Sequence, residues 1–265
     1  VCGPAACVTT MTEPLFFTQE LTVCFGGLCA LSGLDLKIHP GQIVGLIGPN
    51  GAGKTTAFNA MTGLAEPVSG RVFFRGVDIT GWSAPRIARA GMARTFQNIK
   101  LYGDLTVIEN VMVAGHALIR YSFLEAIAGL GRFSSDEKAL RKKAAQLLEV
   151  MGLIDVAHEK AMSLPYGSQR KLEMARALAL NPQMLLLDEP VAGMNPIETI
   201  EFGDVLLRIH KELNLTTCLI EHDMGFVMDV CNKIQVLDHG TPIAFGTPDE
   251  IRADEKVIAA YLGEG

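Results

Sequence analysis

The chain has 265 residues, of which 49% are hydrophobic and 20% are charged, and its formal net charge at pH 7 is −6. This balance argues against a nucleic-acid partner, because no face or tail concentrates Lys and Arg. A chain of this length holds one large domain, or one domain with a sizeable insertion. No run reaches the ~18 uncharged apolar residues that a membrane span needs, so we do not expect the chain itself to be a channel or carrier.

The first ten residues, VCGPAACVTT, lack the charged segment and the apolar core of a signal peptide. Met11, followed by Thr-Glu-Pro, has the pattern of a natural start. We therefore interpret residues 1–11 as an N-terminal extension, either disordered or an artefact, and residues 12–265 as one domain.

The cysteines form no CxxC pair; they are Cys2, Cys7, Cys24, Cys29, Cys218 and Cys231. Cys24 and Cys29 are close enough in sequence to suggest a metal site, but no His/Cys pair with zinc-site spacing accompanies them. We therefore expect the cysteines to be buried or incidental thiols in a reducing compartment.

Short apolar and β-branched runs predict strands. LFFTQELTVCF (15–25) alternates as an edge strand does, whereas QIVGLIG (42–48) indicates a buried strand that runs into a glycine loop. RVFFRG (71–76) follows an expected turn at Ser69-Gly70. Further buried or half-buried strands are predicted over MLLLDEP (184–190), TTCLIEH (216–222) and KIQVLDHG (233–240).

Helix starts are marked by capping patterns. The stretches 106–109 (TVIE) and 134–137 (SSDE) have capping-box spacing, and Asn195-Pro196 with Glu198 predicts a third start. After the second start, one apolar stripe is expected from Leu140, Ala144, Leu147, Leu148 and Met151. Strands come early and late, while residues from about 100 to 180 are almost wholly helical, which predicts an α/β core with a helical insertion.

A glycine-rich loop follows the strand at 42–48. GPNGAGKTT (48–56) fits the phosphate-binding pattern G-x-x-x-x-G-K-[ST]. Gly51 and Gly53 let backbone N–H groups turn toward phosphate oxygens, Lys54 adds a positive charge, and the Thr55 hydroxyl suits Mg²⁺. The sequence predicts a nucleotide site formed by Gly48, Pro49, Asn50, Gly51, Ala52, Gly53, Lys54, Thr55 and Thr56.

Charged side chains follow two of the later strands. Asp188 ends the apolar run LLLDEP and suits Mg²⁺ held through water, while Glu189 beside it can polarise a water for in-line attack on a γ-phosphate. His222 ends the next apolar strand. Because ligands gather at the carboxyl ends of parallel strands, we interpret His222 as a site residue rather than a structural histidine.

The stretch SLPYGSQR (163–170) places a glycine and small polar groups at a helix N-terminus, where backbone N–H groups favour an anion. Pro165 stands in the turn before the helix, where a missing N–H costs little. The stretch has no lysine loop and no metal ligand of its own, which raises the question of whose phosphate it binds.

Taken in order, these residues resemble the ATPase subunits of ABC transporters. The matching elements are GPNGAGKTT (Walker A), Gln97 in RTFQN (Q-loop), LPYGSQ (signature), LLLDEP (Walker B), AGMNP (D-loop) and EHD (switch histidine). The resemblance spans essentially residues 12–262. It implies a P-loop NTPase core with a mainly parallel sheet, an N-terminal antiparallel β subdomain and an inserted helical subdomain over about 98–180.

The resemblance also implies roles for individual residues. Glu189, His222 and Gln97 are expected to be catalytic, and Thr55, Gln97 and Asp188 to meet Mg²⁺. Phe25 falls where the family places an aromatic ring against adenine; the alternative is a core strand phenylalanine. The signature residues Tyr166, Gly167, Ser168 and Gln169 are expected to cap the ATP held by a second subunit, with Gly193 and Asn195 along the seam.

A closer likeness is to the ATPases of bacterial branched-chain amino acid importers. It rests on FGGLCAL, FNAMTGL, RTFQNIKLYGDLTVIENV, EHDMGFVMDVCNKIQVLDHG and YLGEG. It implies ATP and Mg²⁺ as cofactors and a position on the cytoplasmic face of the inner membrane. The implied partners are a second ATPase subunit, two membrane permease subunits and, indirectly, a periplasmic binding protein. Related importers take urea, amides or other small polar solutes, so the solute stays open.

Two other classes of function compete with this interpretation. A soluble ABC-type ATPase acting on DNA or ribosomes predicts basic patches, paired cassettes or long coiled-coil inserts. A P-loop kinase for a small molecule needs a lid and an acceptor site. Neither set of features is evident, and a kinase leaves the signature, the D-loop and the switch histidine unexplained.

The signature departs from the family pattern Leu-Ser-Gly-Gly-Gln. Pro165 replaces the serine, Tyr166 the first glycine and Ser168 the glutamine, while Gly167 remains. Proline offers neither a hydroxyl nor an N–H, so one charge-assisted hydrogen bond, worth roughly 1.5–3 kcal/mol, should be missing at the partner's ATP. We therefore predict an asymmetric heterodimer; the alternative is that the subfamily tolerates this variation with little loss.

Overall fold

A computed structural model describes residues 13–97, 100–116 and 132–262. Residues 1–11 and the cysteines at positions 2 and 7 lie outside the described residues, so the interpretation of this segment stays a prediction. None of the helices in the described ranges combines the length and the apolar character that crossing a membrane requires.

The N-terminal residues form an antiparallel sheet with the strand order β2-β1-β5-β6 and β3 against β1. Its strands are β1 (Phe16–Phe25), β2 (Leu28–Leu34), β3 (Lys37–Ile38), β5 (Ser69–Phe74) and β6 (Val77–Asp78). β1 pairs with β2 on one side and with β5 on the other, so the expectation that this segment is an edge strand is wrong. Its alternation arises instead because Phe16, Leu21 and Val23 face the core.

Gly70 lies within β5, so the turn expected at Ser69-Gly70 is also wrong. The Gly70 backbone has φ +84°, and a Cβ there would lie 2.4 Å from the carbonyl oxygen of Glu20 on β1. The absence of a side chain at Gly70 therefore lets β1 and β5 approach closely, at a point where the β1–β5 register shifts.

The second sheet has six strands in the order β11-β10-β4-β9-β8-β7, and only the β10–β11 pairing is antiparallel. Its strands are β4 (Ile43–Ile47), β7 (Met92–Arg94), β8 (Met184–Asp188), β9 (Thr216–Ile220), β10 (Lys233–Asp238) and β11 (Thr241–Gly246). Every residue of β4, β8 and β9 is buried, as continuous apolar runs predict for a parallel sheet covered on both faces.

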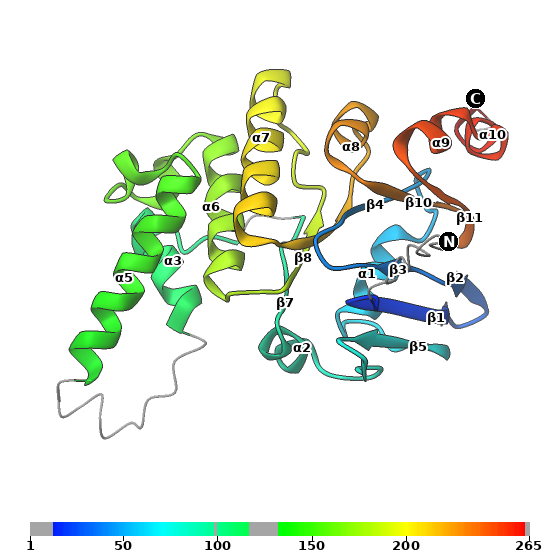
Figure 1. Cartoon of the computed structure of the whole chain (residues 1–265), viewed down its shortest axis with the longest axis horizontal. Coiled ribbons are helices and arrows are strands. Elements are labelled where there is room, and N and C mark those ends of the chain that lie inside the picture. Colours follow the sequence, from blue (N-terminus) through cyan, green and yellow to red (C-terminus); the bar gives the residue numbers. More distant parts are fainter. Residues whose placement is uncertain (1–12, 98–99, 117–131, 263–265) are drawn as a thin grey trace, which may run out of the picture.

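The helices are α1 (Lys54–Met61), α2 (Ala84–Ala90), α3 (Val107–His116), α5 (Arg132–Val150), α6 (Tyr166–Ala179), α7 (Pro196–Leu213), α8 (Met224–Val230), α9 (Pro248–Ala253) and α10 (Glu255–Leu262). In Figure 1, α3, α5 and α6 pack together on the left, and the antiparallel sheet lies at the lower right. The predicted α/β class, with an N-terminal antiparallel sheet and an inserted group of helices, is confirmed. The bounds of 98–180 for that group stay a prediction.

Two of the three predicted helix starts are confirmed. Before α3, the Thr106 N–H donates to Glu109 Oε2 at 2.8 Å, and Asn195 with Glu198 forms a complete capping box at α7. The start expected at 134–137 is wrong, because α5 begins at Arg132 and already includes those residues. The apolar stripe of α5 is confirmed: Leu140, Ala144, Leu148 and Met151 are buried and Leu147 is partly buried.

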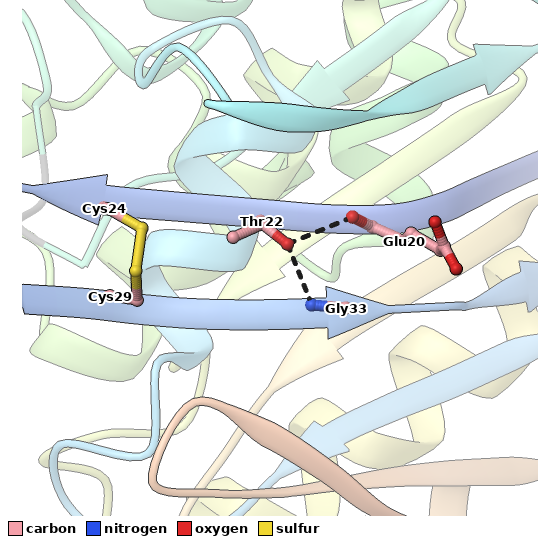
Figure 2. The surroundings of a disulfide bond; sticks show 5 residues. All are labelled: Glu20, Thr22, Cys24, Cys29 and Gly33. Atoms are coloured by element: carbon pink, nitrogen blue, oxygen red, sulfur yellow. Dashed lines mark hydrogen bonds between the residues drawn. A yellow bond between two sulfur atoms is a disulfide. The ribbon is translucent and has the colours of Figure 1, made fainter.

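The expectation that all cysteines are buried or incidental thiols is wrong for Cys24 and Cys29. Antiparallel pairing of β1 with β2 sets Cys24 opposite Cys29, and a disulfide joins them (Figure 2). Cys218 and Cys231 are buried thiols, as expected. Burial raises the pKa of Cys231 to about 12, so the group stays protonated at neutral pH.

Phe202 of α7 joins the helices to the core of the second sheet. Its side chain is 1% exposed, and its ring centroid lies 6.3 Å from that of Phe226 on α8. Such a ring fills volume that neighbouring side chains cannot fill without repacking.

Replacing this ring tests the packing. We expect Phe202→Ala to lower the free energy of unfolding by about 3–5 kcal/mol, through lost burial and an unfilled cavity. Ile200→Ala on the same helix is the control, because Ile200 is 65% exposed and its loss should change stability by less than about 0.5 kcal/mol. Urea denaturation followed by circular dichroism measures both; equal effects would contradict the assigned packing.

Candidate functional site

The loop from β4 to α1 needs glycine at two positions for steric reasons. Gly48 has φ +148°, and a Cβ on it would lie 2.0 Å from the Leu237 carbonyl oxygen. Gly53 has φ +94°, and a Cβ there would lie 2.3 Å from the carbonyl oxygen of Ala30 on β2. The loop is therefore packed against β10 and β2 at both of its ends. Gly51 (φ +78°) lies at the open top of the loop.

Lys54 is the buried cation of this loop. The side chain is 6% exposed, and Nζ donates to the carbonyl oxygens of Gly48 at 2.6 Å and Pro49 at 2.8 Å. Thr55 and Thr56 follow in the first turn of α1, where Thr55 is exposed. The N-cap of α1 is Gly53, which has no side chain to occupy the N–H groups of that turn. A positive side chain and a helix N-terminus thus meet in one loop, as an anion requires.

Glu189 contacts both of the other residues predicted to be catalytic, Gln97 and His222. Its Oε2 accepts a hydrogen bond from Gln97 Nε2 at 2.8 Å, and its Oε1 lies 2.9 Å from His222 Nε2. The three residues follow β7, β8 and β9, whose parallel register brings their carboxyl ends to one edge. The Glu189 backbone has φ +49°, a left-handed conformation that costs a non-glycine residue of order 1–3 kcal/mol.

Asp188 is held by an arginine to which the sequence analysis assigned no role. Arg94 Nη2 donates to Asp188 Oδ2 at 2.7 Å, and both side chains are almost fully buried. Arg94 Nη1 also donates to Asn59 Oδ1 of α1 and to Oγ1 of its C-cap residue Thr62, both at 2.9 Å. The guanidinium thus joins the end of β8 to the helix that follows the loop. The available signal was an arginine three residues before Gln97, in a strand leading to the site.

Glu221 is a second residue that sequence reasoning missed. It is 3% exposed; Oε1 accepts from the Val191 N–H at 2.8 Å, and Oε2 accepts from the His222 N–H at 3.0 Å. Burial raises the pKa of the Glu221 carboxyl above its ordinary value, although these hydrogen bonds oppose the shift. The side chain therefore ties the loop after Glu189 to the loop that carries His222. An acid directly after the fully apolar strand β9 was the available signal.

The helix start at 165–169 has the geometry expected from the sequence. Pro165 is the N-cap of α6 and supplies no side-chain hydrogen bond to it. Pro165 and Tyr166 are exposed, Gly167 is buried, and Ser168 and Gln169 are half-buried. A Cβ on Gly167 would lie 2.9 Å from Glu198 Oε1, and a Cβ on Gly193 would lie 3.3 Å from the Tyr166 ring.

Arg170 connects this helix start with the loop of Gln97. Its Nη2 donates to the Tyr166 hydroxyl at 2.9 Å and to the Gln97 carbonyl oxygen at 2.8 Å, and its Nη1 donates to the Phe96 carbonyl oxygen at 3.2 Å. Arg170 is 4% exposed. The buried guanidinium therefore links the two segments through two carbonyl acceptors and one hydroxyl acceptor.

Phe25 lies at the tip of the β1–β2 hairpin, opposite Leu28. Its side chain is 59% exposed, so the alternative of a core strand phenylalanine is wrong. Ala30, five residues further along the hairpin, contributes the carbonyl oxygen against Gly53. The hairpin therefore stands beside the phosphate-binding loop with an aromatic ring at its free end.

Comparisons with known proteins identify the family of this chain. Residues 31–192 match the family described as ABC transporter, and residues 241–265 match the family described as branched-chain amino acid ATP-binding cassette transporter. The high-affinity branched-chain amino acid transport ATP-binding protein BraF of Pseudomonas aeruginosa is 43% identical, over 96% of this chain and 100% of that protein. LivG of Escherichia coli K12, which carries the same description, is 42% identical over the same shares.

Among solved structures, the ADP conformation of MJ1267, an ATP-binding cassette of an ABC transporter, superposes with a TM-score of 0.83. The two chains are 30% identical, and the match covers 95% of this chain and 100% of the MJ1267 chain. The fold and the loop at 48–56 define a P-loop ATPase. The chain belongs to the ABC transporter family, as an ATP-binding subunit.

The buried carboxyl of Glu221 gives a testable pH dependence. The folded group binds its proton more tightly than the unfolded group, so its contribution to stability is full below the ordinary pKa of 4.5 and is lost as pH rises through the raised folded pKa. We expect the difference in free energy of unfolding between the wild type and Glu221→Gln to fall with pH across that window. Denaturation in urea from pH 4 to 8 measures it.

The control for this experiment is Glu212→Gln, because Glu212 is exposed on α7. Its carboxylate faces water whether the chain is folded or not, so this variant should follow the wild-type pH trend. A wild-type minus Glu221→Gln difference that stays flat or rises with pH would contradict the assignment.

Proposed function

We propose that this chain binds and hydrolyses ATP to drive an importer for branched-chain amino acids. The observation that carries the proposal is the Glu189 carboxylate, which contacts both Gln97 and His222 at the edge of the sheet where the phosphate-binding loop begins. A carboxylate oriented by an amide and an imidazole is suited to accept a proton from a water that attacks the γ-phosphate.

The nucleotide site is proposed from the loop of residues 48–56. Backbone N–H groups at the start of α1 and the ammonium of Lys54 would bind the phosphates, with Lys54 exchanging its carbonyl partners for phosphate oxygens. The exposed ring of Phe25 would stack on the adenine.

The oxygen donors near this loop fit Mg²⁺. We propose Thr55, Asp188 and Gln97 as the residues that hold it, directly or through water. In the described part of the chain, no group of three His, Cys, Asp or Glu side chains could hold a metal ion alone, which suits an ion bound largely through phosphates. When bound, Mg²⁺ neutralises charge that develops on the phosphates during transfer.

Within this chain, each catalytic residue has a defined task. Glu189 orients the water and takes its proton, and His222 and Gln97 fix the carboxylate through its two oxygens. Glu221 keeps the loops of Glu189 and His222 at a fixed separation through two backbone hydrogen bonds. The left-handed backbone at Glu189 suits a group held ready for chemistry.

The signature residues are proposed to act on a second subunit. Tyr166, Gly167, Ser168 and Gln169 would cap the ATP bound by the partner ATPase, with Gly193 and Asn195 at the seam. Pro165 and Tyr166 are exposed, which leaves this helix start accessible to a partner. The remaining partners proposed are two membrane permease subunits and a periplasmic binding protein, with this chain on the cytoplasmic face of the inner membrane.

The branched-chain amino acid solute rests on the relatives. BraF and LivG are described as high-affinity branched-chain amino acid transport ATP-binding proteins and match this chain over their full lengths. Uptake of radiolabelled leucine in cells that lack this chain tests the assignment, with urea uptake as the comparison. Loss of leucine uptake alone supports the proposal; loss of urea uptake with normal leucine uptake would replace it with the alternative solute.

The role of Glu189 gives a direct prediction. Glu189→Gln should keep ATP affinity and lower turnover by about 10²–10⁴-fold, because the amide cannot accept the proton. The variant should also accumulate as an ATP-bound dimer on size-exclusion chromatography. Lys54→Ala is the control, and it should lose ATP binding itself. Turnover equal to the parent would show that Glu189 is not the base.

Pro165 gives a prediction at the second ATP. Pro165→Ser should strengthen ATP-dependent association with the partner ATPase or raise turnover, because the hydroxyl restores a hydrogen bond to phosphate. Serine at the N-cap also stabilises α6 by about 0.5–2 kcal/mol. Pro165→Ala, which lacks the hydroxyl, is the control for removing the proline ring. If Pro165→Ser changes neither association nor turnover, the proposal that Pro165 weakens the contact with the partner's ATP is wrong.

A further inference from the structure

The β1–β2 hairpin has little to hold its tip in place except its own strand pairing. Phe25 is 59% exposed and Leu28 is 71% exposed. A Cβ built on Gly26 or Gly27, between them, would meet no atom within 4 Å. Residues 24–29 contain no buried residue, and β1 pairs with β5 only as far as Thr22. This end of the hairpin is therefore a two-stranded ribbon without a packed face, which is only marginally stable in water. The position of the Phe25 ring therefore depends on how firmly the two strands are joined.

The strand pairing next to the tip is irregular. The β1–β2 register shifts between Leu21 and Val23, and again between Val23 and Cys24. Thr22 bridges the gap, because its Oγ1 donates to the Glu20 carbonyl oxygen at 3.1 Å and accepts from the Gly33 N–H at 3.0 Å (Figure 2). Backbone hydrogen bonds alone thus hold the hairpin less firmly than in a regular ladder.

The Cys24–Cys29 disulfide crosses the hairpin between this irregular stretch and the tip. Cys24 directly precedes Phe25, and Cys29 directly precedes Ala30, whose carbonyl oxygen lies against Gly53 of the phosphate-binding loop. The bond therefore ties the strand that ends in the aromatic ring to the strand that rests on the loop.

We propose that Cys24 and Cys29 form a redox modification site, whose oxidation by glutathione disulfide tightens adenine nucleotide binding by fixing the Phe25 ring. The inference rests on the proposed function, since it takes Phe25 as the surface for adenine. Fixing a binding group in its bound position lowers the entropy lost on binding. We expect the oxidised chain to bind ATP about three- to tenfold more tightly than the dithiol form.

The exchange is a two-electron reaction. The thiolate of one cysteine attacks a sulfur of glutathione disulfide and releases one glutathione thiolate, which leaves a mixed disulfide on the protein. The second cysteine thiolate attacks the protein-side sulfur, forms the Cys24–Cys29 bond and releases the second glutathione. Two protein thiols lose two electrons and two protons, and glutathione disulfide takes them up as two glutathione thiols.

The four other cysteines allow the site to be isolated. Cys24 is half-buried and Cys29 exposed, so small thiols and disulfides reach the pair. Cys218 and Cys231 are buried, and burial raises the pKa of both, so they carry no thiolate for exchange. The test uses the full chain with Cys2→Ser and Cys7→Ser, which removes the two cysteines outside the described residues.

Isothermal titration calorimetry in EDTA, which prevents turnover, measures the dissociation constant of ATP for the reduced and the oxidised chain. Inorganic triphosphate is the second ligand, because it uses the phosphate loop without the adenine surface. We expect a three- to tenfold lower dissociation constant for ATP after oxidation and no change for triphosphate. Cys24→Ser/Cys29→Ser in the same background is the matched control, and it should match the reduced chain under both conditions.

Several outcomes overturn the inference. Mass spectrometry that finds no Cys24–Cys29 bond after glutathione disulfide treatment would do so. Equal ATP affinities in the two verified redox states would refute it and leave the ATPase proposal intact. An equal redox effect on triphosphate would locate the change in the phosphate loop and so refute the role of Phe25. Failure of both ligands to bind in either state would overturn the proposed function and this inference together.

Discussion

The parallel pairing of β8 with β9 is the constraint on which the site depends. Asp188 is paired with Ile220, and the Glu189 N–H donates to the Ile220 carbonyl oxygen at 2.9 Å. Both strands are buried along their whole length, so a slip in register would displace side chains from their packing on both covered faces. The energy of the core therefore fixes where Glu189 and His222 lie relative to each other. Chemistry at the sheet edge is set by packing well inside the sheet.

Polar links then refine what the sheet establishes. Arg94 joins Asp188 to α1, and Glu221 joins the two loops that leave β8 and β9. Both side chains are almost fully buried, and each forms hydrogen bonds with groups whose desolvation would otherwise be costly. Buried networks of this kind hold a single geometry, because breaking one bond leaves an unsatisfied group behind. The carboxylates at the centre are thus held in one arrangement.

Features with a local cause were predictable from sequence. The glycine loop, the buried strands β4, β8 and β9 and the capped starts of α3 and α7 depend on residues close together in the chain. The central position of β1 depends on its pairing with β5, which no short pattern reports. Arg94 and Asp188 are 94 residues apart, so their ion pair was also hidden. The disulfide could have been predicted from the sequence, because a two-residue Gly-Gly turn places Cys24 opposite Cys29.

Arg170 connects the loop of Gln97 to the start of α6. Its buried guanidinium donates hydrogen bonds to the carbonyl oxygens of Phe96 and Gln97 and to the hydroxyl of Tyr166. A displacement of the loop that carries Gln97 therefore pulls on the first turn of α6. The amide that contacts Glu189 and the start of α6 are therefore coupled through one side chain. Moving one without the other would break hydrogen bonds of a buried guanidinium, which is costly.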